Sequence, residues 1–190
     1  LWGVKDPRMC RFVPLWQAVA GAVGAQPAWI IMLRHPMEIV RSLHQREGMS
    51  RGRAYLLWLR HALEAEQTTR GSRRAFVDYA ALTADWRPVM KRLAGDLDLP
   101  LKLRSHKAQQ AIDAFLKPQL RHFSFDDETL AEDSRLARWA GEVHGALGRL
   151  AAGKDAEAER ALDRVAAELD VAGWYYDDAV ADAVPREKRL

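Results

Sequence analysis

Apolar residues along the chain form two kinds of pattern, short continuous runs and longer segments with helical spacing. The continuous runs lie at 1–4 (LWGV), 28–33 (AWIIML) and 74–79 (RAFVDY) and are typical of strands, and AWIIML has the pattern of a strand buried on both faces. Segments with apolar residues three or four positions apart separate these runs. This alternation predicts an α/β fold with a parallel sheet and crossover helices on its faces.

The helices expected in the first hundred residues have recognisable ends. Pro36 occupies a first helical position, where a backbone N–H would have no acceptor within the helix. The same helix is expected to end at Gly48. Thr83 and Asp85 open a later helix. The predicted helices of this part are 8–23, 36–48, 51–70 and 83–97. The first has an apolar stripe that should face the core, formed by Phe12, Leu15, Trp16, Val19 and Val23.

The chain changes character after Pro100, because strand patterns stop and helical patterns continue. We therefore expect two parts: an α/β core over residues 1–101 and a helical C-terminal extension over residues 102–190 that packs on this core. The helical patterns of the second part lie at 105–117, 130–152 and 156–170.

The composition bounds the class of protein. Of the 190 residues, 48% are hydrophobic and 29% are charged, as in globular domains. No apolar run approaches the roughly 20 residues of a membrane-spanning helix. The single Cys10 excludes an internal disulfide framework and fits a reducing, cytoplasmic compartment. One thiol and six scattered histidines show no metal-ligand spacing, so we expect no metal.

The net charge is +3, from 29 basic and 26 acidic residues, and this excess is too small to indicate a nucleic-acid partner. The distribution of the charges is more informative, because arginines crowd the first third of the chain while acids gather after Asp126. An anionic ligand is therefore expected in the N-terminal part. The arginines concerned are Arg8, Arg11, Arg34, Arg41, Arg46, Arg51, Arg53 and Arg60.

The segment IIMLRHPMEIVRSL, residues 30–43, places an arginine at the end of a predicted strand and a serine eight residues later. Ligands of parallel sheets bind beyond the carboxyl ends of the strands, and a helix beginning at Pro36 would offer free amides and partial positive charge there. Arg34 adds a planar cationic fork suited to phosphate oxygens, and Ser42 adds a hydroxyl. These residues predict a phosphate site. In the alternative interpretation Arg34 pairs with a neighbouring acid and Ser42 faces solvent.

The segment LRHPMEIVRSL resembles the 3′-phosphate-binding element of sulfotransferases that use 3′-phosphoadenosine 5′-phosphosulfate (PAPS), and the later segment FLKPQLRHF resembles their bacterial branch. The resemblance implies a P-loop-like sulfotransferase fold in which Arg34 and Ser42 bind the 3′-phosphate and Tyr79, in FVDYAALTADW, lies against the adenine. WGVKDPRMC resembles the family's loop near the transferring sulfuryl group, which implies a catalytic part for Lys5. The similarity extends over roughly residues 2–101.

Two features depart from the family pattern. Ala80 and Ala81 stand where the family has an acidic pair after its tyrosine. The family also has a loop rich in Gly, Ser, Thr and Arg that cradles the 5′-phosphosulfate through its amides, and no such loop precedes LWGVKDP. The later run AGAVGAQP is expected to be a helix end. We therefore expect either a longer natural protein or a chain that does not hold the sulfuryl end of the donor.

Several side chains have two candidate roles. Lys5 could stabilise the bridging oxygen of the donor or be a solvated loop lysine. Asp6 could be the general base or cap the helix that follows, and the cap is favoured. His35 is expected to be an N-cap or packing residue. Arg121 and His122 could fold back over the nucleotide, although an ordinary surface loop is favoured. Three tryptophans at helical core spacing are expected to pack in the core: Trp58, Trp86 and Trp139.

The sequence thus predicts a sulfotransferase, or a domain of one, that moves a sulfuryl group from PAPS to a hydroxyl or amine of a small-molecule or carbohydrate acceptor. Sulfuryl transfer is an in-line displacement helped by positioning and by cationic groups. Two alternatives stay open: a sulfotransferase-like binding module without activity, and an unrelated P-loop phosphate-handling enzyme such as a kinase. Neither the acceptor nor the oligomeric state follows from the sequence.

Overall fold

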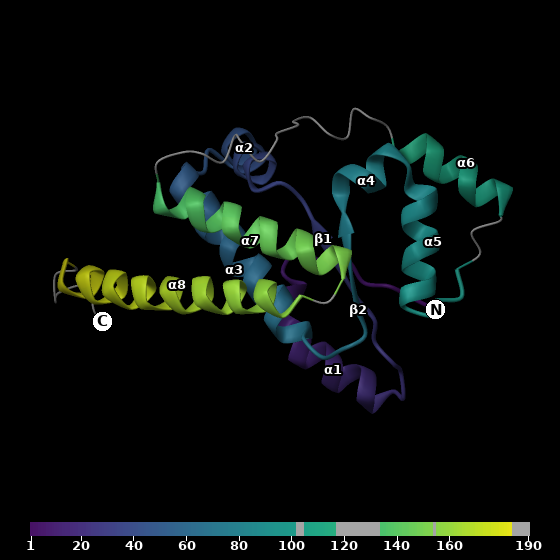
Figure 1. Ribbon diagram of the computed structural model, residues 1–190, viewed down its shortest axis with the longest axis horizontal. Helices are drawn as coiled ribbons and strands as arrows, with labels where there is room; N and C mark the ends of the chain where they lie inside the picture. The colour runs from purple at the N-terminus through teal and green to yellow at the C-terminus, as the bar shows by residue number, and fades with distance from the viewer. Residues whose placement is uncertain (102–104, 117–133, 154, 184–190) are drawn as a thin grey trace.

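The computed structural model describes residues 1–101, 105–116, 134–153 and 155–183, with side chains up to Gly173. In this part of the chain the protein is mostly helical, with a small two-stranded parallel sheet near its middle (Figure 1). An α/β arrangement with much helix is therefore present. The elements are η1, a 3-10 helix (Met9–Phe12), α1 (Val13–Ala22), β1 (Trp29–Leu33), α2 (Pro36–Glu47), α3 (Arg51–Thr69), β2 (Arg74–Asp78), α4 (Tyr79–Ala84), α5 (Trp86–Asp96), α6 (His106–Phe115), α7 (Arg135–Ala152) and α8 (Ala156–Ala183).

The sheet pairs β1 with β2 in parallel, and Leu33 stands opposite Asp78 at the carboxyl ends of the two strands. Both strands lie within the runs predicted at 28–33 and 74–79, where β-branched and aromatic residues favour extended backbone. The chain passes from one strand to the other through α2 and α3, so the predicted helical crossover is confirmed.

Residues 1–4, predicted as a strand, do not form one, because residues 1–6 have no regular structure. Leu1 is 81% exposed, and Trp2 and Val4 are also exposed. A short apolar run becomes a strand only where a neighbouring strand pairs with it, and the sheet of the described residues contains β1 and β2 alone. Trp2 packs instead near Trp16, with 6.4 Å between the ring centres.

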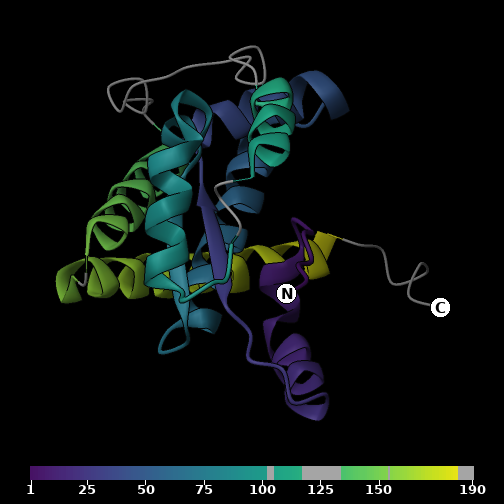
Figure 2. The same cartoon turned by 90° about the vertical axis from the view of Figure 1, so that its right-hand side faces the viewer.

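The strand β1 is less buried than its sequence predicts. One face of the sheet, with Ile31 and Phe76, packs on the core formed with α3 and α7. On the other face α5 covers only β2, where Val77 contacts Leu93 and its neighbours. Figure 2 shows β1 beside α5 with no helix in front of it. Ile30 and Met32 are therefore 48% and 46% exposed, and the prediction of burial on both faces is wrong.

The apolar stripe predicted for the first helix exists but faces outward. Helix α1 and η1 pack on α3 through a different side, with Cys10, Val13 and Ala20 buried. Apolar residues at helical spacing indicate an apolar face, but they do not show which side of the helix packs on its neighbour. The expected inward orientation is therefore wrong for the exposed members of the stripe, which are Phe12, Leu15, Val19 and Val23.

The main hydrophobic core lies between α2, α3, α7, α8 and one face of the sheet. Leu59 of α3, Val143 of α7 and Leu162 of α8 are fully buried in it. The helices beyond residue 101 thus share a core with the α/β part, while the boundary at that residue stays a prediction. Core packing of the tryptophans is confirmed in the main: Trp86 and Trp139 are buried, and Trp58 is partly buried against the core.

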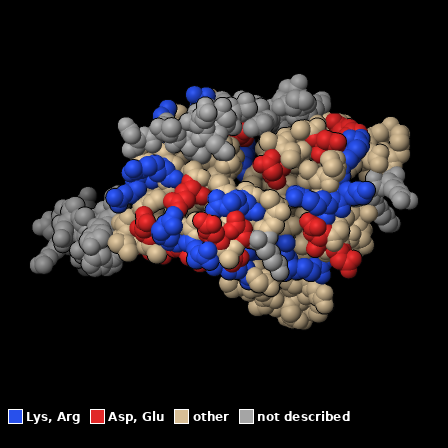
Figure 3. Space-filling model, viewed as in Figure 1, with Lys and Arg blue, Asp and Glu red and all other residues tan. Residues whose placement is uncertain are grey.

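The surface has a mixed charge. Figure 3 shows Lys and Arg side chains interspersed with Asp and Glu side chains on the face that it presents. Within the described residues, no helix combines the length and the apolar character that crossing a membrane requires.

A buried ion-pair network joins α3, β2 and α8. The carboxylate of Glu66, fully buried, accepts hydrogen bonds from Arg70 at 2.6 Å and from Arg74 at 2.9 Å. Asp163 of α8 accepts from Arg70 as well, at 2.9 Å. Hydrogen bonds to Glu66 and Asp163 raise the pKa of Arg70. Loss of Glu66 would leave the partly buried Arg74 with Glu159, at 3.7 Å, as its remaining acidic partner among the described residues, so the network is sensitive to substitution of Glu66.

Glu66→Ala should therefore lower the free energy of unfolding by about 3–5 kcal/mol, measured by urea denaturation. The matched control is Glu47→Ala, because Glu47 forms an exposed pair with Arg46. Such surface pairs contribute about 0–1 kcal/mol. Equal losses in the two variants would contradict the role given to the buried network.

Candidate functional site

The carboxyl ends of the two strands bring two predicted site residues together. Because Leu33 pairs with Asp78, the residues that follow them, Arg34 and Tyr79, are neighbours at one edge of the sheet. The guanidinium carbon of Arg34 lies 4.8 Å from the centre of the Tyr79 ring, which is a cation–π contact. Tyr79 is the first residue of α4, and α2 begins two residues after Arg34. The β1–α2 and β2–α4 turns therefore form one site.

Arg34 also pairs with an acid on α2. Its Nε donates a hydrogen bond of 2.7 Å to Oε2 of Glu38. The Glu38 side chain is only 1% exposed, and that of Arg34 is 22% exposed. The neighbouring acid of the alternative interpretation is therefore present. The pair uses Nε, however, and no described residue accepts a hydrogen bond from Nη1 or Nη2 of Arg34. As far as the described residues go, the outer fork of the guanidinium is therefore open to an anion.

Ser42 lies on the same face of α2 as Glu38, because helical residues four apart are neighbours. The rise of an α-helix puts them about 6 Å apart along the axis. The Ser42 side chain is half-buried, and its hydroxyl has no hydrogen-bond partner among the described residues. Glu38 and Ser42 thus lie on one face of α2, and Glu38 contacts Arg34, but no hydrogen bond joins Ser42 to Arg34 within the described residues.

The expectation of free amides at the start of α2 is wrong. Pro36 has no N–H, and the amide of Met37 donates to Nδ1 of His35 at 3.3 Å. The amides of Glu38 and Ile39 donate to the carbonyl oxygen of His35, at 3.0 and 3.4 Å. His35 is thus the N-cap, as predicted. An anion at this place would be bound by side chains, with the helix dipole as an additional attraction.

Two residues of this edge were not predicted. Glu38 stands four positions after Arg34, and this spacing is a local signal of pairing. His144 of α7 contacts His35 edge to face, with 5.2 Å between the ring centres. The two histidines are far apart in the sequence, so no local pattern indicates that they meet.

Lys5 and Asp6, the predicted catalytic residues, make no hydrogen bond or ion pair with Arg34, Ser42 or Tyr79. Lys5 is exposed in the N-terminal segment that has no regular structure. Asp6 accepts hydrogen bonds from the backbone amide of Arg8 at 2.7 Å, and from its Nε and Nη2 at 3.0 and 2.9 Å. The Asp6 carboxylate is therefore engaged within its own turn.

The hydrogen bonds from Arg8 lower the pKa of Asp6 to about 2. A carboxylate with so low a pKa is a weak general base near neutral pH. The carboxylate closes the turn before η1, but the N-cap of η1 is Arg8 and it makes no side-chain cap hydrogen bond, so the predicted helix cap at Asp6 is wrong. A catalytic role for Asp6 stays a prediction, as does one for Lys5. Arg121 and His122 lie outside the described residues.

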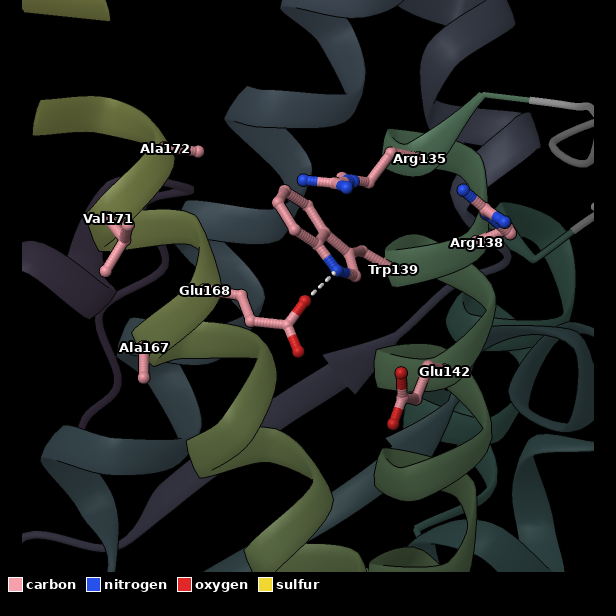
Figure 4. A pocket seen from close by; sticks show the side chains of 8 residues that line it. All are labelled: Arg135, Arg138, Trp139, Glu142, Ala167, Glu168, Val171 and Ala172. Carbon is pink, nitrogen blue, oxygen red and sulfur yellow. Dashed lines mark hydrogen bonds between the residues drawn. The ribbon is translucent and has the colours of Figure 1, made fainter. Parts of the chain in front are cut away.

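A second concave region lies between α7 and α8 (Figure 4). The indole N–H of Trp139 donates to Glu168 at 2.9 Å, Arg135 stacks on Trp139, and Glu142 pairs with Arg164. Because most of its polar groups already have partners, this groove is less suited to a specific ligand than the strand end. Its lining residues are Arg135, Arg138, Trp139, Glu142, Ala167, Glu168, Val171 and Ala172.

Comparison with protein-family models, with curated proteins and with solved structures finds no match to this chain. The described residues contain no group of three or more His, Cys, Asp or Glu side chains that could hold a metal ion. The chemistry of the site therefore rests on the geometry at the ends of β1 and β2.

An NMR titration of the Asp6 carboxyl group should give a pKa of about 2, and Arg8→Ala should raise this pKa toward the ordinary 3.8. The pKa is lower in the folded than in the unfolded protein. The Asp6–Arg8 interaction therefore stabilises the fold above about pH 4 and is lost as the pH falls toward 2. A pKa near 3.8 in both proteins would contradict the pairing.

Proposed function

We propose that this chain binds the 3′-phosphate of PAPS and acts in the transfer of its sulfuryl group to a hydroxyl or amine acceptor. The observation that carries the proposal is the environment of Arg34. This arginine stands at the carboxyl end of a parallel strand, bonded to Glu38 through Nε and stacked against Tyr79, and no described residue accepts a hydrogen bond from its outer amino groups.

The separation of these groups suits a nucleoside 3′-phosphate. The base and the 3′-phosphate are attached to the same ribose, so their binding groups must lie close together. Arg34 and Tyr79 are in contact, and a phosphate on the Arg34 fork would leave the adenine beside Tyr79. Ser42, further along α2, supplies a hydroxyl donor for another oxygen of the same phosphate.

Lys5 is the residue proposed to act on the sulfuryl group. Its ammonium group is exposed and makes no ion pair with a described residue, so a donor anion can approach it. A cation beside the bridging oxygen stabilises the charge that develops there during an in-line displacement. This role is carried over from the resemblance of WGVKDPRMC to the family's loop.

A second candidate function is a sulfotransferase-like module that binds the nucleotide without transferring the group. The observation that favours it is the Asp6 carboxylate, whose pKa of about 2 makes it a weak general base. The module would bind adenosine 3′,5′-bisphosphate through the same Arg34, Ser42 and Tyr79. Sulfuryl transfer to any of a panel of phenols, sugars and amines would exclude it.

Isothermal titration calorimetry with adenosine 3′,5′-bisphosphate tests the proposed site. Ser42→Ala should weaken binding about two- to tenfold, because one hydrogen bond is lost. Arg34→Lys keeps the charge but removes the fork, and it should weaken binding about tenfold or more. Arg46→Lys, a change of the same kind on exposed α2 surface, is the control and should have no effect.

The choice of nucleotide provides the second arm of this experiment. Adenosine 5′-monophosphate lacks the 3′-phosphate, so it should bind more weakly and should not respond to either the Ser42 or the Arg34 substitution. ATP should not compete with the bisphosphate. Equal affinity of the wild-type protein for ATP and for the bisphosphate would overturn the proposal and favour a kinase-like phosphate site.

A further inference from the structure

We infer that Glu38 is a positioning residue that fixes Arg34 for the phosphate, so that the site recognises the shape of a phosphomonoester rather than negative charge in general. This inference deepens the proposed function and rests on it. Its starting point is the bond between Nε of Arg34 and Oε2 of Glu38, at 2.7 Å, from a carboxylate that is almost wholly buried.

Two contacts fix the guanidinium group from different directions. The Glu38 bond determines the direction of the Nε–H, and the Tyr79 ring lies 4.8 Å from the guanidinium carbon. An arginine side chain loses rotamer freedom when it is ordered. Because Glu38 and Tyr79 already order Arg34, ligand binding does not have to offset this loss of side-chain entropy.

The guanidinium nitrogen that bonds Glu38 determines which donors of Arg34 remain for the ligand. A carboxylate that bonded both Nη atoms would occupy the outer fork and compete with phosphate. Glu38 bonds Nε instead, and Nη1 and Nη2 have no acceptor among the described residues. These two amino groups form the planar pair of donors that matches two phosphate oxygens.

The pair also changes the electrostatics of the site. Glu38 lies in the first turn of α2, where its negative charge interacts favourably with the helix dipole and offsets the charge of Arg34. The charge of the Arg34–Glu38 pair itself therefore contributes little to anion binding, and the first amides of α2 are already bonded. Directional hydrogen bonds from the fork have to supply the selectivity.

Two substitutions of Glu38 separate positioning from charge. Glu38→Gln keeps an oxygen that accepts from Nε but removes the opposing negative charge, so adenosine 3′,5′-bisphosphate should bind at least as tightly as to the wild type. Glu38→Ala removes the acceptor, so Arg34 loses its orientation and binding should weaken about tenfold. The matched control is Glu66→Gln, because Glu66 is also a buried partner of arginines but belongs to another network.

A spectroscopic readout reports on the pair without the nucleotide. The Nε–H resonance of Arg34 should be protected from solvent exchange in the wild type and in Glu38→Gln, and it should lose this protection in Glu38→Ala. If the alanine variant does not fold, the affinity of the glutamine variant and the exchange protection of the wild-type Nε–H still test whether Glu38 positions Arg34. An unprotected Nε–H in the folded wild type overturns the inference.

The outcomes distinguish this inference from the proposed function. Wild-type binding that needs Arg34, together with unchanged affinity in Glu38→Ala, overturns the positioning role alone. Equal weakening in both Glu38 variants also overturns it, since the retained acceptor would then have no effect. A wild-type protein that does not bind the bisphosphate overturns the proposed function, and the inference falls with it.

Discussion

The parallel pairing of β1 with β2 is the constraint on which the candidate site depends. Parallel strands end at the same edge of a sheet, so the turns that follow Leu33 and Asp78 must meet. One turn supplies Arg34 and the other supplies Tyr79, and they touch although each is fixed by its own strand. The crossover through α2 and α3 makes this pairing possible, and the core beneath the sheet holds both strands in register.

Two buried glutamates have different consequences in this fold. Glu66 is bonded by two arginines that have further acidic partners, so its network joins secondary-structure elements and leaves little for a ligand. Glu38 is bonded to Arg34 through Nε, so part of the guanidinium stays open. A structural ion pair and a binding group therefore differ in which guanidinium nitrogens the carboxylate occupies. Both glutamates are buried, but of Arg34, Arg70 and Arg74, Arg34 is the one whose outer donors have no acceptor among the described residues.

The parts of the fold that depend on local pattern were predictable from the sequence. The two strands, the start of α2 at Pro36 and its end at the left-handed Gly48 follow from neighbouring residues. Tertiary placement was not predictable in the same way: the apolar stripe of α1 faces outward, and β1 is covered on one face only. In the site, the contact of His144 with His35 depends on how α7 packs, and no local spacing reveals it.

Phosphorus NMR can show whether Arg34 binds the 3′-phosphate, because adenosine 3′,5′-bisphosphate gives separate resonances for its two phosphates. Addition of the protein should shift and broaden the 3′-phosphate resonance, and this response should be much weaker at the same protein concentration when Arg34 is replaced by lysine. The 5′-phosphate should respond less and should not depend on Arg34. A response confined to the 5′-phosphate, or one unchanged by the Arg34 substitution, would show that Arg34 does not bind the 3′-phosphate.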